Sequence, residues 1–298
     1  MGKFDLTGVI KEVQDSLKKD NRRKKQFGLG DNLGYISQDD SDYVVMPEWW
    51  KATYGVPGLQ FGKIVEIAGN SDSGKTSLCI EAMKRAIAQG YGVIYVETEL
   101  KTTTEDLVNA GIDPTQVMLV QTAITEEAFD GSFRLWDQFF DKFPDEKLLF
   151  VYDSYGNTVS LRDSEIDMTR EHSKVGGAAK TNRLGINTMI AKMQRDTVAV
   201  LFVNYSYSNI GTVGKTNAGG NALQFFSTII IQSAKGSKIR AVRNKKDVIL
   251  GREVIWTTDK NHYAKALLDA EGDPVLLPPK VQLAITSEGF KVKKAKGD

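Results

Sequence analysis

Residues 69–76, with the sequence GNSDSGKT, have the spacing of a phosphate-binding loop. They lie between a predicted strand at 63–68 and a predicted helix at 76–89, which is the context that this motif requires. Glycines let the backbone N–H groups curve around phosphates, and the start of the helix adds a partial positive charge. Lys75 would reach the β- and γ-phosphates, and the Thr76 hydroxyl would bind Mg²⁺. The predicted nucleoside triphosphate site comprises Gly69, Asn70, Ser71, Asp72, Ser73, Gly74, Lys75, Thr76 and Ser77.

A second candidate metal ligand, Asp153, follows the apolar segment 148–152. A carboxylate at the carboxyl end of a strand beside a phosphate loop is well placed to hold Mg²⁺ through water. The alternative is an aspartate that only caps the next turn. With ATP as the default nucleotide, the two motifs together predict a site for ATP and Mg²⁺.

Two carboxylates, Glu97 and Glu99, follow the predicted strand 93–96 at the edge beside the phosphate loop. Hydrolysis of a nucleotide requires a group that orients the attacking water, and either glutamate has the right chemistry. Side chains alternate along a strand, so both would face the same way. Periodicity therefore leaves both candidates open.

The elements that must position these residues alternate between strands and helices. Apolar segments of strand length lie at 63–68, 92–97, 117–121, 148–152 and 198–204, and segments of helical spacing at 76–89, 104–110, 126–142 and 178–195. This alternation predicts an α/β fold with a mostly parallel central sheet flanked by helices. Later apolar segments have no helices between them, and we expect them to extend the same sheet in antiparallel fashion: 228–232, 238–242, 253–258 and 281–286.

The chain divides into three expected parts. Residues 1–30 combine a helix bearing an apolar stripe with a basic linker, residues 31–260 form the core, and residues 261–298 form a short C-terminal extension. The N-terminal stripe is compatible with a solvated helix end or with a helix that docks on another subunit.

Composition excludes several classes of protein. The 298 residues include 39 Lys and Arg against 38 Asp and Glu, one Cys and two His. A single Cys rules out a disulfide framework and a Cys-cluster zinc site, and two His far apart in sequence argue against a His-based metal site. The longest apolar runs fall well short of the ~18 residues that a membrane span needs, and the chain does not open on an apolar signal sequence. We expect a cytoplasmic protein with no membrane partner.

Four patches between about residue 58 and residue 245 resemble the RecA family of recombinases, which includes bacterial RecA and the phage UvsX-type proteins. They are the entry strand 62–67, the segment 95–99 with 110–113, the pair 203–204 with GGNAL at 219–223, and RNK at 243–245. The resemblance implies a RecA-like P-loop ATPase core with an N-terminal docking helix.

The resemblance also assigns catalytic roles. Ungapped spacing back from Gly111 selects Glu99 as the residue that polarises the attacking water. In RecA-like filaments the cations matching Arg243 and Lys245 reach the nucleotide of the adjacent subunit. The implied catalytic residues are Glu99, Lys75, Arg243 and Lys245.

Two polar, glycine-containing loops stand where the family has its DNA-binding loops, at 166–177 and 206–220. The second is long for a connection in a compact domain, which is typical of functional or disordered loops. A mobile surface loop without a ligand is the alternative interpretation. The implied DNA-binding residues are Arg170, Lys174, Ser206, Tyr207, Ile210, Gly211, Val213, Lys215, Gly219, Gly220 and Asn221.

The chain also departs from bacterial RecA. Tyr205 stands where bacterial RecA has glutamine, so the relay from phosphate to loop must differ chemically, and Gln224 replaces an expected lysine. The 38 residues after Lys260 are interrupted by prolines and are too few for bacterial RecA's helical C-terminal domain. The sequence resembles a compact core of phage type.

The resemblance implies a DNA-dependent ATPase that forms filaments on single-stranded DNA and promotes homologous pairing and strand exchange. Its partners would be single-stranded DNA, homologous duplex DNA and further copies of the chain, with possible single-strand-binding and mediator proteins, in the cytoplasm of a bacterial or phage-infected cell. Two other functions are compatible with the motifs: a ring-forming motor or helicase, and a non-catalytic, ATP-gated recombination mediator.

Overall fold

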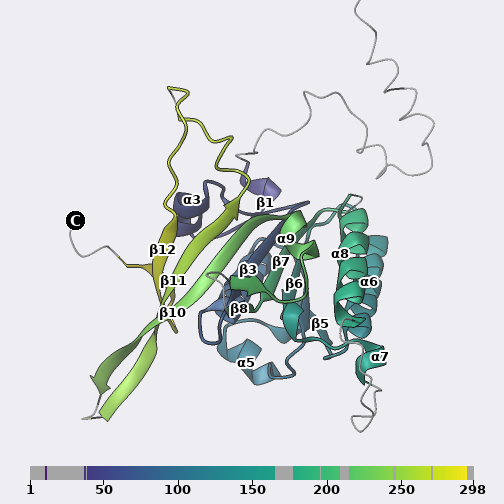
Figure 1. Ribbon diagram of the computed structural model, residues 1–298, viewed down its shortest axis with the longest axis horizontal. Coiled ribbons are helices and arrows are strands. Elements are labelled where there is room, and N and C mark those ends of the chain that lie inside the picture. The colour runs from purple at the N-terminus through teal and green to yellow at the C-terminus, as the bar shows by residue number, and fades with distance from the viewer. Residues whose placement is uncertain are drawn as a thin grey trace, which may run out of the picture.

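The computed structural model describes residues 39–164, 177–194, 196–208, 215–243, 246–269 and 271–293, together with Lys11 and Ser37. Within these residues one nine-stranded sheet has the order β13-β12-β11-β10-β3-β7-β6-β4-β5 (Figure 1). Its strands are β3 (Ile64–Gly69), β4 (Gly92–Glu97), β5 (Met118–Gln121), β6 (Leu148–Asp153), β7 (Val198–Asn204), β10 (Ser227–Arg243), β11 (Lys246–Asn261), β12 (Lys280–Thr286) and β13 (Gly289–Val292). The expected N-terminal docking helix lies outside the described residues, apart from Lys11.

Neighbouring strands from β10 to β5 are parallel, and those from β10 to β13 are antiparallel. The expected α/β fold with a mostly parallel sheet is confirmed. One expectation was wrong, because segments 228–232 and 238–242 form a single strand, β10, whose first part pairs parallel with β3. The physical reason is the length of the connection between Asn204, where β7 ends, and Ser227, where β10 begins. It is long enough for β10 to start at the same end of the sheet as β7 and therefore to run parallel to β3.

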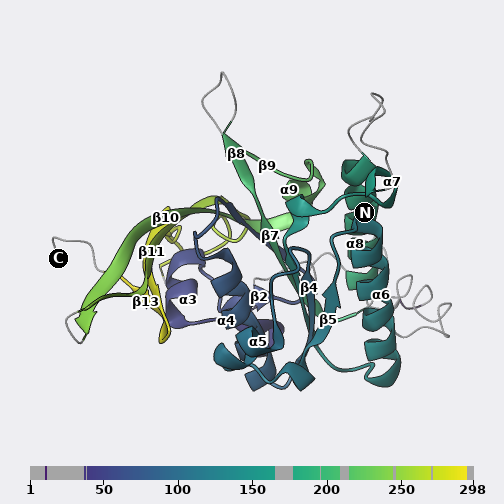
Figure 2. The same ribbon diagram turned by 90° about the horizontal axis from the view of Figure 1, so that it is seen from below.

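Helices cover both faces of the parallel part of the sheet (Figure 2). One face packs against α3 (Glu48–Tyr54), α4 (Lys75–Ala88) and α5 (Thr104–Asn109), and the other against α6 (Thr125–Lys142), α8 (Gly177–Met193) and α9 (Ala222–Phe226). Strand β6 shows why these strands have continuous apolar sequences: Leu149 and Val151 join one buried cluster, whereas Phe150 and Tyr152 join the other.

Shorter elements complete the described chain: η2 (Asp40–Asp42), β1 (Tyr43–Val45), β2 (Gly58–Gln60), η3 (Pro114–Gln116), η4 (Tyr155–Asn157), α7 (Leu161–Ser164), β8 (Ser206–Ser208) and β9 (Lys215–Asn217). Strands β1 and β2 pair with each other, and β8 and β9 form a separate antiparallel ribbon. No helix in the described part of the chain is long and apolar enough to cross a membrane.

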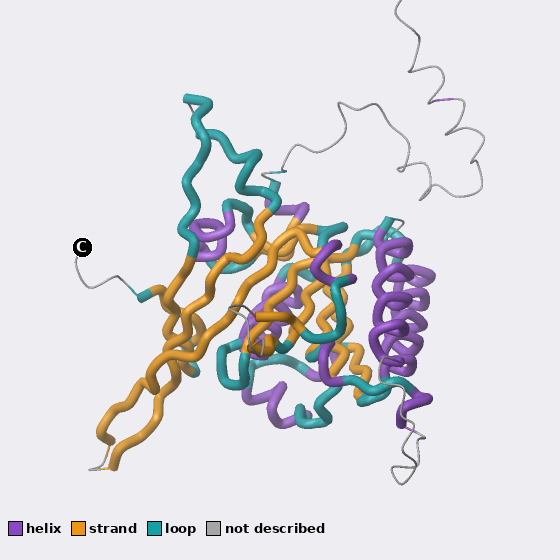
Figure 3. Tube along the Cα trace, in the orientation of Figure 1, coloured by secondary structure: helices purple, strands orange, loops and turns teal. Residues whose placement is uncertain are grey.

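Strands β10 and β11 form a long hairpin that projects from the body of the molecule (Figure 3). Residues 280–292, within the expected C-terminal extension, continue the sheet beside β11 as β12 and β13. In the parallel part of the sheet, the neighbouring strands β3, β7, β6 and β4 all have their carboxyl ends at the same edge. In open α/β sheets ligands bind at this edge, and the candidate site lies there.

Candidate functional site

The predicted phosphate loop connects β3 to α4. Asp72 and Gly74 adopt left-handed backbone conformations, with φ of 61° and 85°, and turn the chain into the first turn of α4. At Gly74 the left-handed conformation strains any other residue, and a Cβ would also lie 2.4 Å from Ile285 Cδ1, which would have to move. The Lys75 ammonium is folded back over the loop and donates to the carbonyl oxygens of Gly69 and Asn70, at 2.9 and 2.7 Å.

Two residues distant in sequence fasten the loop to the sheet. Ser233 on β10 lies 2.6 Å from Ser73, hydroxyl to hydroxyl, and the Trp256 indole N–H on β11 donates to the Ser73 carbonyl at 3.0 Å. Neither residue is part of a sequence motif, so neither was predicted. Their contacts fix the position of Ser73 in the middle of the loop, which favours a preformed site.

Thr76 and Asp153 meet as the metal-site hypothesis requires. The Thr76 hydroxyl donates to Asp153 Oδ2 at 2.7 Å. Burial raises the pKa of Asp153 to about 6, although the hydrogen bond from Thr76 acts in the opposite direction. A hydroxyl and a carboxylate oxygen are hard ligands of the kind that Mg²⁺ binds together with waters and substrate phosphates, so the residues present fit this ion.

The structure separates the two glutamates that periodicity left open. Glu97 is buried: one carboxylate oxygen accepts from the backbone N–H of Glu99 at 2.9 Å, and the other from the N–H of Lys101 at 3.1 Å and the Gln121 side-chain amide at 2.9 Å. Its carboxylate therefore organises the loop after β4. Because β4 ends at Glu97, the alternation expected through Glu99 does not continue.

Glu99 lies beside the phosphate loop, in contact with residues of two other segments and with Lys101 of its own loop. Its Oε1 accepts from the Tyr205 hydroxyl and, at 3.3 Å each, from Ser154 and Asn157, while Oε2 accepts from the Lys101 ammonium at 2.6 Å. Partial burial alone would raise the pKa of Glu99, but the hydrogen bonds, led by those from Lys101 and Tyr205, outweigh it and hold the pKa below its usual value.

Tyr205 joins this group to the second predicted DNA loop. It lies between β7 and β8, and its ring centroid is 4.9 Å from the Lys75 nitrogen. Its backbone N–H donates to the Asn204 side chain at 2.8 Å, and its carbonyl accepts from the Ala218 N–H at 2.8 Å. One residue thus touches both the phosphate loop and Ala218, which directly precedes the turn at Gly219–Asn221.

A buried carboxyl group, Glu66 on β3, connects the end of β7 with the end of β9. Its Oε1 accepts from the side-chain amides of Asn204 and Asn217, at 2.8 Å each, while its Oε2 is buried without a partner. Burial raises the pKa of Glu66 despite these two hydrogen bonds. The sequence offered one signal for this residue, a glutamate inside an otherwise apolar strand, but nothing that identified its partners.

The described part of the second predicted DNA loop consists of the β8–β9 ribbon and the turn after it. Ser206 is buried and its hydroxyl lies within hydrogen-bond distance of Asn217 and Gln232, whereas Tyr207 is exposed. Lys215 begins β9 and Arg243 ends β10. Six predicted site residues lie outside the described residues: Arg170, Lys174, Ile210, Gly211, Val213 and Lys245.

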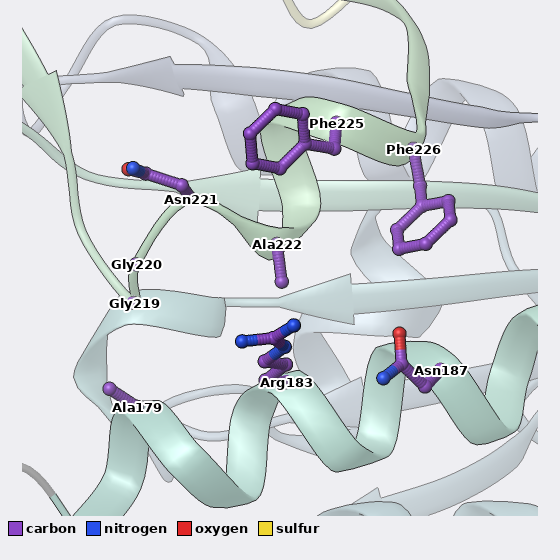
Figure 4. A pocket seen from close by; sticks show the side chains of 9 residues that line it. All are labelled: Ala179, Arg183, Asn187, Gly219, Gly220, Asn221, Ala222, Phe225 and Phe226. Carbon is purple, nitrogen blue, oxygen red and sulfur yellow. The ribbon is translucent and has the colours of Figure 1, made fainter.

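Gly219, Gly220 and Asn221 line a pocket of about 480 Å³ between α8 and α9. Arg183 and Asn187 line it from α8, and Figure 4 shows Arg183 rising from that helix toward the turn. Neither residue is among the predicted DNA-binding residues. Ala179, Arg183 and Asn187 are spaced four residues apart and therefore lie on one face of α8. This spacing is the sequence signal that could have identified Arg183 and Asn187. Phe225 and Phe226 close the opposite side of the pocket.

A second pocket, of about 350 Å³, borders the phosphate loop on the side of the long hairpin. Asp72, Gly74 and Ser77 line it together with Arg252 and Lys238 from the hairpin. Only the first three belong to the predicted nucleotide site. The hairpin residues are distant in sequence and became identifiable only when β10 and β11 were placed.

A parallel sheet with helices on both faces and a phosphate loop between its first parallel strand and the following helix defines the class of P-loop α/β proteins. Residues 21–275 match the family model of the RecA N-terminal domain. The chain belongs to the RecA family of recombinases.

Curated relatives give the extent of the similarity. The chain is 31% identical to Protein RecA of Malacoplasma penetrans (strain HF-2) over 215 residues, which are 70% of this chain and 61% of that protein. It is 28% identical over 234 residues to Protein RecA of Bdellovibrio bacteriovorus, covering 74% of this chain and 56% of that protein. With Protein RecA of Mesoplasma florum the identity is 26% over 241 residues, 74% of this chain and 70% of that protein. The chain thus spans less than two thirds of the length of the first two relatives.

Proposed function

We propose that the chain is a DNA-dependent ATPase that forms filaments on single-stranded DNA and promotes homologous pairing and strand exchange. The observation that carries this proposal is the chain of contacts through Tyr205, which joins Lys75 and Glu99 at the phosphate loop to Ala218 at the glycine turn. A nucleotide bound at the phosphate loop can therefore change the geometry of the glycine turn through these contacts.

In the proposed reaction Lys75 leaves its loop carbonyls to neutralise charge on the phosphates, and Thr76 and Asp153 hold Mg²⁺. The ion, when bound, offsets the negative charge of the β- and γ-phosphates. Glu99 orients a water molecule whose oxygen forms a bond to the γ-phosphorus, and it takes the proton of that water. The bond from phosphorus to the bridging oxygen breaks, and ADP leaves with the electron pair.

The pocket that borders Ser77 and Arg252 supports a place for the nucleoside. It adjoins the start of α4, so a phosphate chain on the loop would continue into it. Arg243 and Lys245 would act on the nucleotide of an adjacent subunit, as the family resemblance implies. Each active site would then be completed only within a filament.

The pocket beneath the glycine turn supports a place for the DNA backbone. The Arg183 side chain supplies a cation, and the turn at Gly219 and Gly220 lets a phosphate approach the backbone closely. Binding through phosphates carries little sequence information, which suits a protein that must accept any strand. The exposed Tyr207 ring is available for base stacking. We place the protein in the cytoplasm, with possible single-strand-binding and mediator partners.

The test is ATP hydrolysis with and without single-stranded DNA, combined with electron micrographs of the same samples. Hydrolysis should increase several-fold with DNA, filaments should form with ATP and DNA, and a labelled strand should exchange into a homologous duplex. Lys75→Ala is the matched negative control, because it removes the phosphate-binding ammonium. Closed rings alone would instead indicate a motor or helicase. Binding of ATP and DNA without turnover would indicate a non-catalytic mediator.

A further inference from the structure

Tyr205 makes two contacts with the groups that the proposed ATPase reaction uses. Its hydroxyl donates to Glu99, and its ring lies against the ammonium of Lys75. The ring is only partly buried, so these contacts are made at the edge of the site and not within the core.

The contact with Glu99 limits what that carboxylate can do. A carboxylate oxygen offers two lone pairs, yet Oε1 faces donors from Tyr205, Ser154 and Asn157. The remaining oxygen is engaged by Lys101. In this arrangement Glu99 has little capacity left to accept a proton from a water molecule.

The contact with Lys75 has a similar consequence. Two of the three N–H donors of the ammonium are directed at the carbonyls of Gly69 and Asn70. The Tyr205 ring covers a further side of the same group, where the cation is attracted to the aromatic face. A phosphate that binds Lys75 must therefore compete with the ring as well as with the two carbonyls.

We propose that Tyr205 is a positioning residue that holds Glu99 and Lys75 in a resting arrangement, and that DNA bound at the Gly219–Asn221 turn releases both. This inference rests on the proposed function and deepens it. The link to DNA is the backbone hydrogen bond from Ala218 to Tyr205, at 2.8 Å, because Ala218 directly precedes the turn. Movement of the turn shifts the Tyr205 backbone and, with it, the hydroxyl and the ring.

Two substitutions separate the contributions of the hydroxyl and the ring. Tyr205→Phe keeps the ring over Lys75 and frees one lone pair of Glu99, so kcat without DNA should rise about tenfold, as expected for one hydrogen bond to a charged group, with KM for ATP little changed. Tyr205→Leu also removes the ring, so the affinity for a non-hydrolysable ATP analogue should rise about threefold. In both variants the ratio of DNA-stimulated to DNA-free hydrolysis should fall.

Tyr91→Phe is the matched control. It removes a phenol hydroxyl at the amino end of β4, where the ring of Tyr91 packs against Phe61, and it should leave both rates unchanged. Thermal melting of all variants shows whether the fold is retained.

The outcomes distinguish a failure of the proposed role of Tyr205 from a failure of the proposed function. A DNA-stimulated wild type together with an unchanged or lower DNA-free kcat in Tyr205→Phe overturns the role of Tyr205 and leaves the proposed function standing. Absence of turnover in the wild type and in Tyr205→Phe overturns both. A raised DNA-free kcat with an unchanged KM supports the inference, because a merely structural loss would lower kcat.

Discussion

Replacing Glu66 by alanine should destabilise the folded protein by about 4 kcal/mol, whereas replacement by glutamine should not. The alanine variant leaves the buried amides of Asn204 and Asn217 without their acceptor. An unsatisfied buried donor costs about 1–3 kcal/mol, and the cavity left by the missing atoms adds to the loss. Glutamine keeps an oxygen at the Oε1 position. Its amide replaces Oε2, which already lacks a partner in the wild type, so the substitution leaves one buried polar group unpaired at this end, as before.

Both variants should differ from the wild type in their dependence on pH, because neither has an ionisable group at position 66. Because burial raises the pKa of Glu66 above its usual 4.5, the folded state holds a proton that the unfolded state releases. The stability associated with this proton is fully present below about pH 4.5 and is lost as the pH rises through the folded pKa. Glu66→Gln has no proton to release, so its stability relative to the wild type should increase as the pH rises above about 4.5.

The assay is urea unfolding followed by circular dichroism, at about pH 4.5 and about pH 7.5, for the wild type, both variants and Glu271→Gln as an exposed control. Linear extrapolation gives each free energy of unfolding. Two results would refute the reasoning: a Glu66→Ala variant within about 1 kcal/mol of the wild type, which is below the cost of one unpaired donor, or a Glu66→Gln difference that is the same at both pH values.

Four further variants test the site itself. Glu99→Gln should lower DNA-stimulated kcat by about 100-fold, the usual scale for general-base catalysis, with an unchanged melting temperature; Glu97→Gln should instead lower the melting temperature, because an amide cannot accept at both ends. Arg183→Ala should weaken binding of single-stranded DNA and reduce by about 1 the slope of log K against log salt concentration, and an unchanged slope in a salt titration would exclude a phosphate contact. Trp256→Phe removes the hydrogen bond to Ser73 and should weaken ATP binding several-fold by calorimetry, whereas an unchanged affinity would show that the loop needs no such support.

The parts of the fold that could be predicted are those that a local pattern determines. Continuous apolar segments identify strands buried on both faces, as at 148–152 and 198–204, and the phosphate loop carries its own signature at 69–76. The direction of β10 could not be read from its residues. It depends on where the preceding crossover returns the chain, which is a property of the whole path from 205 to 226.

The candidate site divides in the same way. Lys75, Thr76 and Asp153 were predictable because their chemistry is tied to motifs, and the structure brings them together. Periodicity alone could not choose between Glu97 and Glu99, and only the family resemblance favoured Glu99. The structural difference depends on where β4 ends: Glu97 closes the strand and accepts from backbone N–H groups, whereas Glu99 lies beyond it. Trp256 contributes through a hydrogen bond across the sheet, and no spacing along a chain can reveal such a partner.

Because Trp256 donates to the phosphate loop, the protein contains an optical reporter of its own nucleotide site. The indole N–H is bonded to the Ser73 carbonyl, and the ring lies 5.7 Å from Trp49 and 5.6 Å from Phe290, centroid to centroid. Any rearrangement of the loop changes the polarity around this indole and its energy exchange with Trp49. Trp136 belongs to the cluster on the opposite face, so it should add a background emission that the loop does not change. Occupancy of the loop should therefore be measurable by intrinsic fluorescence, without labelling either the protein or the nucleotide.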